Sequence, residues 1–241
     1  MNEQHVTLAH GNGGRFMREL IEDVFATALS ASELDVQADA VPIDLGDGEV
    51  MITTDGFTVQ PLEFPGGNIG SLAIHGTTND LAVAGARPMY LTLNAFIEEG
   101  FEVARLERII GSLANAAVEA GVRISAGDTK VVPHGQADKI FINTSGIGVM
   151  GHDLEISGRN AQVGDKVLIN GTIGDHGMAL LTRRKGFTVE ADLKSDCAPL
   201  NGLIEKVTSG VGVKWMRDPT RGGVATALNE LANGKKWGIQ L

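Results

Sequence analysis

The 241-residue sequence is poor in cysteine, in aromatic residues and in long apolar runs. A single cysteine, Cys197, excludes an internal disulfide and fits a reducing compartment. Aromatic residues make up 5% of the chain, which disfavours a stacking platform for nucleic acid. No run approaches the ~18 apolar residues of a membrane span, and the first residues, MNEQHVTLAH, are too polar for a signal peptide. We therefore expect a cytoplasmic protein that does not contact the membrane.

Basic residues are also scarce, because 20 Lys and Arg stand against 30 Asp and Glu, giving a formal net charge of −10. An acidic surface repels phosphate backbones, so nucleic acid is not an expected partner. The same repulsion would oppose ATP. A bound triphosphate would therefore need divalent cations between its oxygens and the carboxylates of the protein.

Glycine is abundant instead, with 32 of 241 residues, nearly twice the usual share of ~7%. Four stretches place an aspartate close to glycine or threonine where a strand-like or apolar run gives out: ITTDG, TTNDLAVAGA, AGDTK and RDPTRGG. Aspartates are hard oxygen ligands for Mg²⁺, and glycines allow backbone amides to approach an anion closely. Together the four stretches predict one shared site in an ATP-using enzyme.

Hydrophobic periodicity predicts both helices and strands, divided between two domains. The predicted helices cover residues 15–30, 72–84, 106–120, 177–184, 200–209 and 223–232, and the predicted strands cover 50–54, 90–96, 123–126, 140–149 and 166–170. A first domain is expected at 1–152 and a second, partial one at 153–241. The final WGIQL reads as a further apolar strand. Because natural domains rarely stop on an unpaired apolar strand, we expect the chain to be cut short of its natural end.

Nine motifs in a fixed order carry a family resemblance that covers essentially the whole chain. They are HGNGG, TTDGFTVQPLEFPGGNIG, TTNDLAVAGARP, IEEGF, AGDTKVVPHG, INTSGIGV, GTIGDHGMALL, SDCAPL and DPTRGG. Together they resemble the HypE family of [NiFe]-hydrogenase maturation factors, which are relatives of aminoimidazole ribonucleotide synthetase, selenophosphate synthetase and thiamine-monophosphate kinase. The resemblance implies an α+β fold of two α/β-sandwich domains, with the second incomplete, and a homodimer formed through the N-terminal domains.

The resemblance also implies a reaction. HypE proteins use ATP and Mg²⁺ to dehydrate a carbamoyl group carried on a protein cysteine, giving the thiocyanate that supplies iron-bound cyanide. The implied partners are the carbamoyltransferase HypF and the HypC–HypD scaffold complex. In the family the carrier is a C-terminal Pro-Arg-Ile-Cys tail, which this sequence lacks, as it lacks the family's Asn-Glu-Gly-Lys stretch. We therefore expect this chain alone not to turn over. A related small-molecule synthetase or kinase, and a non-catalytic scaffold for maturation partners, remain alternatives.

Four aspartates are the candidate metal ligands and are expected to contact ATP through the metal. The resemblance implies Asp55, Asp80 and Asp128, and a looser alignment adds Asp39. On residue chemistry alone, Asp55 and Asp128 could instead end a strand in a turn. Asp80 could instead cap a helix, unless 72–84 is one helix, in which case Asp80 lies inside it and points into a cleft.

Six further residues complete the candidate site. His10 and Lys130 are the candidate catalytic groups, because a cation beside carboxylates can neutralise a phosphate oxygen and the resemblance places His10 near the reacting group. His10 could instead be an ordinary surface histidine. The other candidates for ATP binding are Asn79, Thr129, His176 and Arg221. His176 and Arg221 could instead be solvated loop residues, and Cys197, which precedes a helix in SDCAPL, is expected to be structural.

Overall fold

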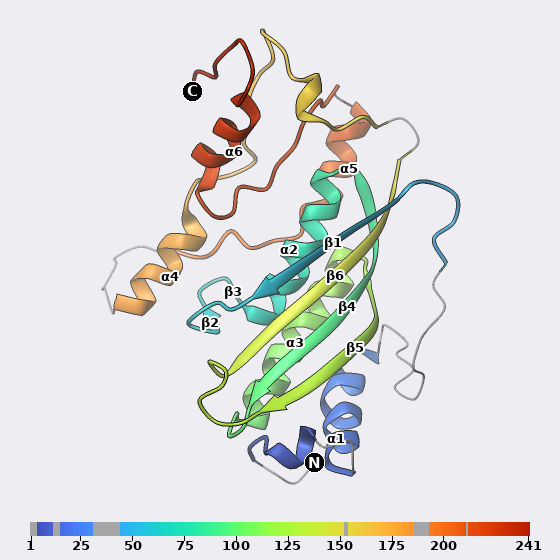
Figure 1. Cartoon of the computed structure of the whole chain (residues 1–241), viewed down its shortest axis with the longest axis vertical. Helices are drawn as coiled ribbons and strands as arrows, with labels where there is room; N and C mark the ends of the chain where they lie inside the picture. The colour runs from blue at the N-terminus through green and yellow to red at the C-terminus, as the bar shows by residue number, and fades with distance from the viewer. Residues whose placement is uncertain (1–3, 12–14, 31–43, 152–153, 186–192, 211) are drawn as a thin grey trace.

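The computed structural model describes residues 4–11, 15–30, 44–151, 154–185, 193–210 and 212–241 (Figure 1). The N-terminal part contains η1 (Leu8–Gly11), α1 (Arg15–Leu20), the π-helical η2 (Ile21–Ala26), β1 (Val50–Phe57), β2 (Glu63–Phe64), β3 (Gly67–Asn68), α2 (Ile69–Val83), β4 (Ala86–Glu98), α3 (Val103–Ala120), β5 (Arg123–Val132) and β6 (Ile140–Met150). The C-terminal part contains η4 (Gly158–Asn160), α4 (Asp175–Lys185), α5 (Asn201–Gly210) and α6 (Gly223–Ala232). Helices and strands mix throughout the N-terminal part, as the predicted α+β class requires.

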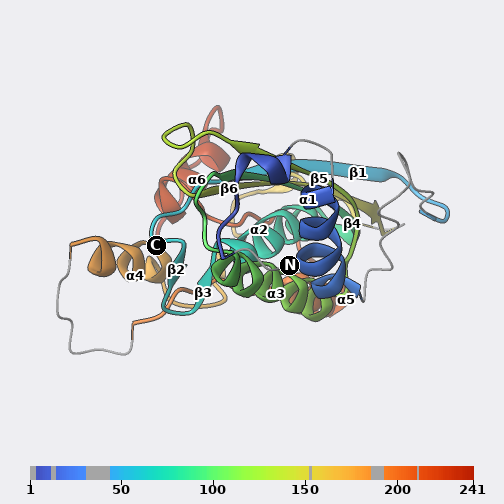
Figure 2. The same ribbon diagram turned by 90° about the horizontal axis from the view of Figure 1, so that it is seen from below.

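One four-stranded sheet organises the N-terminal part, in the order β1-β6-β4-β5. β6 pairs antiparallel with both β1 and β4, whereas β4 and β5 run parallel and are joined through α3. Seen from below, the sheet forms one layer and α2 and α3 lie together on one of its faces (Figure 2). The hydrophobic core fills the space between these layers and includes Leu91, Ile97, Ile109 and Ile124, each at most 1% exposed.

Local sequence explains where the two central helices begin and end. Asn68 caps α2, because its side chain accepts hydrogen bonds from the backbone N–H groups of Gly70 and Ser71 at 2.9 and 3.1 Å. α3 ends at Gly121, which adopts the left-handed conformation with φ of 67° that favours glycine. The predicted end of this helix at residue 120 is confirmed.

β1 and β5 are both longer than predicted, and the added part of each contains an aspartate. β1 continues from Thr54 to Phe57, and β5 continues from Ala126 to Val132. Asp55 and Asp128 therefore lie inside strands, not in turns at strand ends. Both strands continue because a neighbouring strand pairs with them over the added residues, and such pairing outweighs the weak strand propensity of Asp and Gly.

The C-terminal part confirms the predicted helices but not the predicted strands. α4, α5 and α6 lie within one or two residues of the predicted bounds at their ends. The prediction of a strand at 166–170 is wrong, and the final WGIQL is also not a strand. A strand needs hydrogen-bonding partners, and in the described part of 154–241 no segment pairs with either. Leu168 is left 84% exposed as a result.

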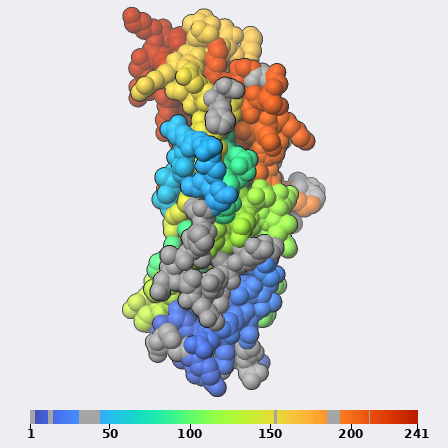
Figure 3. Space-filling view, turned by 90° about the vertical axis from the view of Figure 1, so that its right-hand side faces the viewer, coloured from blue at the N-terminus to red at the C-terminus, as the bar shows by residue number. Residues whose placement is uncertain are grey.

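The molecule is long, with α1 near one end and α6 near the other (Figure 3). None of the helices in the described ranges has the length and apolarity needed to cross a bilayer.

Replacing Gly70 with alanine should destabilise the fold, because a Cβ at this position would lie 2.3 Å from the carbonyl oxygen of Ile109. The backbones of α2 and α3 would have to separate, at a cost of about 1–3 kcal/mol. Gly111→Ala in α3 is the matched control, since a Cβ there meets no atom within 4 Å and should stabilise the helix by roughly 0.5–1 kcal/mol. Thermal melts of the two variants should shift in opposite directions, and a shift in the same direction would contradict this account of the α2–α3 contact.

Candidate active site

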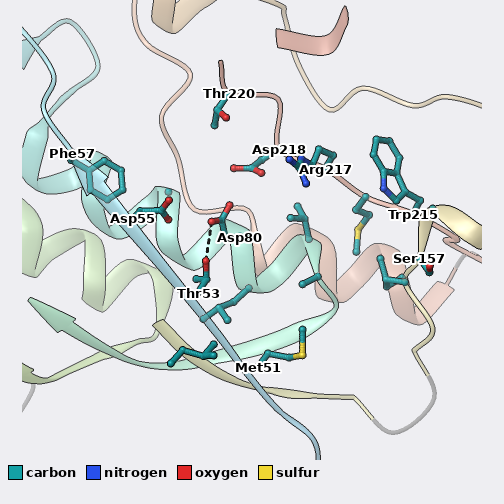
Figure 4. Close-up of a pocket in the computed structure, with 18 residues that line it drawn as sticks. Met51, Thr53, Asp55, Phe57, Asp80, Ser157, Trp215, Arg217, Asp218 and Thr220 are labelled. Carbon is teal, nitrogen blue, oxygen red and sulfur yellow. Dashed lines mark hydrogen bonds between the residues drawn. The ribbon is translucent and has the colours of Figure 1, made fainter. Parts of the chain in front are cut away.

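A cavity of about 600 Å³ opens between the two parts of the chain. Its walls are β1, the second half of α2, the segment 156–158 that follows the sheet, and the C-terminal segment 215–220. Figure 4 shows these side chains converging from the four segments. A pocket at such a junction can change shape when the two parts move relative to each other.

The carboxylates occupy a different part of the cavity from Trp215 and Met51, and Phe57 lies beside Asp55 (Figure 4). Asp55, Asp80 and Asp218 lie toward one another, whereas Trp215 and Met51 lie away from them (Figure 4). Further apolar residues of the lining are Leu81, Val83, Ala84, Ile156 and Met216. An elongated ligand with a flat apolar end and an anionic, metal-bound end matches this division.

Strand alternation and helix periodicity bring Asp55 and Asp80 together. On β1, Asp55 has the same orientation as Thr53 and Phe57, toward α2, because alternate side chains share a face. Asp80 lies in the last turn of α2, so the N-cap alternative does not hold. The Thr53 hydroxyl donates to Asp80 Oδ2 at 3.2 Å, and the Thr77 hydroxyl donates to Asp55 Oδ2 at 3.2 Å. Each carboxylate is thus held by a threonine of the other element.

Burial and mutual repulsion raise the pKa values of two of these carboxyl groups. The pKa of Asp80 rises to about 7, first because burial removes it from water and then because Asp218 and Asp55 are close. The pKa of Asp218 is also raised, again mainly by burial. A divalent cation would relieve this repulsion. Within the described residues, however, no group of three or more His, Cys, Asp or Glu side chains could hold a metal ion by itself.

Asp128, Thr129 and Lys130 do not line this cavity. They lie on β5, at the opposite edge of the sheet from β1. Thr129 is 5% exposed and faces the helices, so by alternation Asp128 and Lys130 point out of the open face of the sheet. There the Lys130 ammonium pairs with Asp128 at 2.9 Å. Within one chain, therefore, Asp128, Thr129 and Lys130 do not lie beside Asp55, and the single shared site predicted for the four stretches does not include AGDTK.

His10 is fully buried and also far from the cavity. It lies in η1, which packs against β5, and its Nδ1 is 3.0 Å from the hydroxyl of Thr7. The alternative of a surface histidine therefore does not hold either. Its Nε2 has no hydrogen-bond partner among the described residues. Asp39, the remaining predicted metal ligand, falls outside the residues that the structure describes.

Asn79 and His176 both bind the segment 195–200 of the C-terminal part. The Asn79 amide donates to the carbonyl of Ala198 at 3.0 Å and accepts from the N–H of Leu200 at 2.8 Å, so both of its polar atoms bind the protein. His176 Nδ1 lies 2.9 Å from the hydroxyl of Ser195. Neither residue lines the cavity.

The cavity instead contains two charged residues that the sequence-based prediction omitted, Arg217 and Asp218. Both belong to RDPTRGG, a stretch that the sequence analysis had singled out. From this stretch, however, only Arg221 was predicted as a site residue. Arg221 is exposed and does not line the cavity, whereas its neighbour Thr220 does. The adjacent opposite charges of Arg217 and Asp218 at the start of the motif were the sequence signal that could have identified them.

Cys197 packs against His75, with its Sγ 3.3 Å from the ring Nδ1. Burial, and secondarily the charge of Asp196, raises the pKa of the Cys197 thiol to about 12. A thiol with so high a pKa is a weak nucleophile at neutral pH. This environment supports the structural role that the sequence predicts for Cys197.

Comparisons with known proteins agree on one family. The chain matches the AIR synthase related protein N-terminal domain over residues 37–150 and the corresponding C-terminal domain over residues 162–241. It is 49% identical to carbamoyl dehydratase HypE of Azotobacter vinelandii, over 98% of this chain and 70% of that protein. Among solved structures, a hydrogenase maturation protein HypE in complex with ATP superposes with a TM-score of 0.90 at 48% identity, over 94% of this chain and 68% of the other. A HypE–HypF complex contains a chain with a TM-score of 0.75 at 47% identity, over 94% of this chain and 75% of that one.

Replacing Asp80 with asparagine should stabilise the metal-free protein at alkaline pH. A carboxyl group whose pKa is higher in the folded than in the unfolded state lowers the stability of the fold progressively as the pH rises from the unfolded pKa to the folded pKa. The loss for Asp80 should therefore build up from about pH 4 and be complete above about pH 7. We expect Asp80→Asn to melt higher than the wild type at pH 8, by about 2–4 °C for each kcal/mol, and the difference to shrink toward pH 5.5. A melting difference independent of pH would contradict the raised pKa.

Proposed function

The chain belongs to the HypE family of carbamoyl dehydratases, within the AIR synthase related proteins, and from this premise we propose that it acts in hydrogenase maturation as an ATP-dependent carbamoyl dehydratase. Its substrate would be a carbamoyl group on a protein cysteine, and its product a thiocyanate that supplies cyanide to the [NiFe] active-site iron. We place this reaction in the cytoplasm, as the sequence predicts.

The reaction balances in two steps. The carbamoyl oxygen attacks the γ-phosphorus of ATP, ADP leaves, and one N–H proton is lost, which gives an S-bound imidate phosphate. The C–O bond then breaks as phosphate departs with the oxygen, and loss of the second N–H proton leaves S–C≡N. Positioning of the γ-phosphate and acceptance of two protons are thus what the protein must supply.

The division of the cavity is the observation that carries this proposal for the present chain. We place the adenine base near Trp215 and Met51, and the triphosphate beside Asp55, Asp80 and Asp218. A carboxylate cluster is a poor site for a bare triphosphate, because like charges repel. The same cluster suits a triphosphate that arrives with divalent cations.

The carboxylates fit Mg²⁺ in the way that nucleotide enzymes commonly bind it. Mg²⁺ is usually held by one or two protein carboxylates together with substrate phosphates and waters. No set of three protein ligands is therefore needed, in keeping with the absence of such a group among the described residues. We propose Asp55 and Asp80 as ligands, with Asp218 in reach, and Mg²⁺ would supply charge neutralisation for the phosphates.

A homodimer would give Asp128 and Lys130 a role. Both point out of the open face of the sheet, where Phe96 is 42% and Ile52 73% exposed. Apolar side chains on one broad face favour association with a second copy. We propose that the N-terminal domains, bounded at residue 152, pair through this face, and that Asp128 and Lys130 act from one copy on the site of the other.

The other predicted roles remain proposals of the same kind. We retain His10 as a candidate catalytic group, and as candidates for ATP or metal contact we retain Asp39, Thr129, His176 and Arg221. The two hydrogen bonds of the Asn79 side-chain amide support a structural role for Asn79 instead. As partners we propose HypF, because a relative forms a complex with it, and the HypC–HypD complex.

ATP binding by this chain should depend on Mg²⁺ and on Asp80. We expect calorimetry with ATP to detect binding in Mg²⁺ and at least tenfold weaker binding in EDTA, because the carboxylates would face bare phosphates. Asp80→Asn should lose at least tenfold in Mg²⁺. Glu205→Gln, which removes the same charge from the exposed surface of α5, is the matched control and should bind as the wild type does. Equally tight binding in EDTA would refute the proposed site.

The fragment 1–152 should sediment as a dimer at tens of micromolar, whereas 153–241 alone should fold poorly. Phe96→Glu places a charge on the open face of the sheet and should yield monomers. Val118→Glu places the same charge on α3, where Val118 is 63% exposed on the helical side, and should leave the dimer intact. A monomeric fragment, or equal sensitivity to both substitutions, would contradict dimerisation through the sheet.

A further inference from the structure

A buried pair of threonines lies directly behind Asp55. Thr77 on α2 and Thr144 on β6 are both 0% exposed, and their hydroxyl oxygens are 2.5 Å apart. The Thr77 hydroxyl is also 3.2 Å from Asp55 Oδ2, and the Thr144 hydroxyl is 3.5 Å from the carbonyl of Ala73. Neither threonine lines the cavity, so neither would touch a ligand there.

Each hydroxyl has a single proton, and this determines the direction of the hydrogen bonds. The Thr77 hydroxyl donates to Asp55 Oδ2, so its one proton points to the carboxylate. The Thr77 oxygen is then free to accept, and the short distance assigns the Thr144 proton to it in preference to the more distant Ala73 carbonyl. A charged acceptor strengthens such bonds, and successive bonds polarise one another. The carboxylate is therefore held from behind by a two-hydroxyl chain.

The adjacent threonine shows that burial alone does not create this arrangement. Thr78 is also 0% exposed, but its hydroxyl has no hydrogen-bond partner within the described residues. Successive residues of a helix point about 100° apart. Thr77 faces β1 and β6, as its bonds to Asp55 and Thr144 require, and Thr78 therefore points in another direction. The two neighbouring positions therefore provide one hydroxyl that can orient a carboxylate and one that cannot.

We propose that Thr77 is a positioning residue, which holds the Asp55 carboxylate in the orientation that binds Mg²⁺–ATP, and that Thr144 holds Thr77 in turn. This inference rests on the proposed function, because it assigns Asp55 to the metal and its nucleotide. The Asp80 carboxylate is held by Thr53 on the cavity wall, whereas the support of Asp55 is wholly internal. Groups that orient a metal ligand typically change metal affinity by about 10–100-fold when they are removed.

The test compares three variants of the full chain by calorimetry with ATP in Mg²⁺. Thr77→Val keeps the shape of the side chain but removes the hydroxyl, and we expect a loss of affinity of about 10–100-fold. Thr77→Ser keeps the hydroxyl and should restore most of the affinity. Thr78→Val is the matched control, one residue away and equally buried, and should bind as the wild type does with equal or higher melting temperature, because it removes an unpaired hydroxyl.

A double-mutant cycle separates positioning from packing. In an Asp55→Asn background, Thr77→Val should cause no further loss, because the group that it orients has gone. An equal additional loss in that background would mean that Thr77 acts only through packing, and would overturn the inference. If Thr77→Val fails to fold, Thr144→Val provides the same comparison one bond further away, with the same expected direction.

The outcome also distinguishes this inference from the proposed function. If the wild type binds ATP in Mg²⁺ but Thr77→Val and Thr144→Val bind equally well, the positioning role is wrong and the site stands. If the wild type itself binds no ATP, the proposed function fails, and the inference fails with it.

Discussion

The contact between α2 and β1 determines the position of the site. It is made of two crossed pairs, in which Thr53 of β1 binds Asp80 of α2 and Thr77 of α2 binds Asp55 of β1. The helix can lie in this register because Gly70 lets its first turn meet the backbone of α3 without a side chain between them. A shift of α2 by one residue would turn Asp80 away from the cavity and break both pairs.

This arrangement costs stability while no cation is bound. Asp80 is half-buried close to Asp218 and Asp55, and burial first and these two charges second raise its pKa to about 7. Such a raised pKa is typical of sites where a ligand supplies the missing charge. Stability and function therefore oppose each other at Asp80, and the substitution that should weaken Mg²⁺–ATP binding should also stabilise the empty protein.

The C-terminal part is attached to the site through α2, by residues other than those that bind β1. Asn79 binds the backbone at Ala198 and Leu200, and His75 contacts Cys197, so a single segment lies along α2. Asp218 reaches the cavity from further along this part of the chain. Consecutive residues of TTND thus have different tasks: Thr77 orients a carboxylate, Asn79 holds the second domain, and Asp80 faces the cavity.

The sequence by itself determined the helices, the first four main strands, the end of α3 and the place of Asp55 and Asp80 in one shared site, because these depend on local periodicity, on glycine conformation and on motifs of the family. It also singled out RDPTRGG, but not that Asp218 would line the cavity. Only the tertiary structure separated Asp128 from Asp55, turned Asn79 toward the protein and buried Thr77 behind a carboxylate. Strand order and helix register decide these outcomes, because they set which residues distant in sequence come within hydrogen-bonding distance, and no local pattern encodes them.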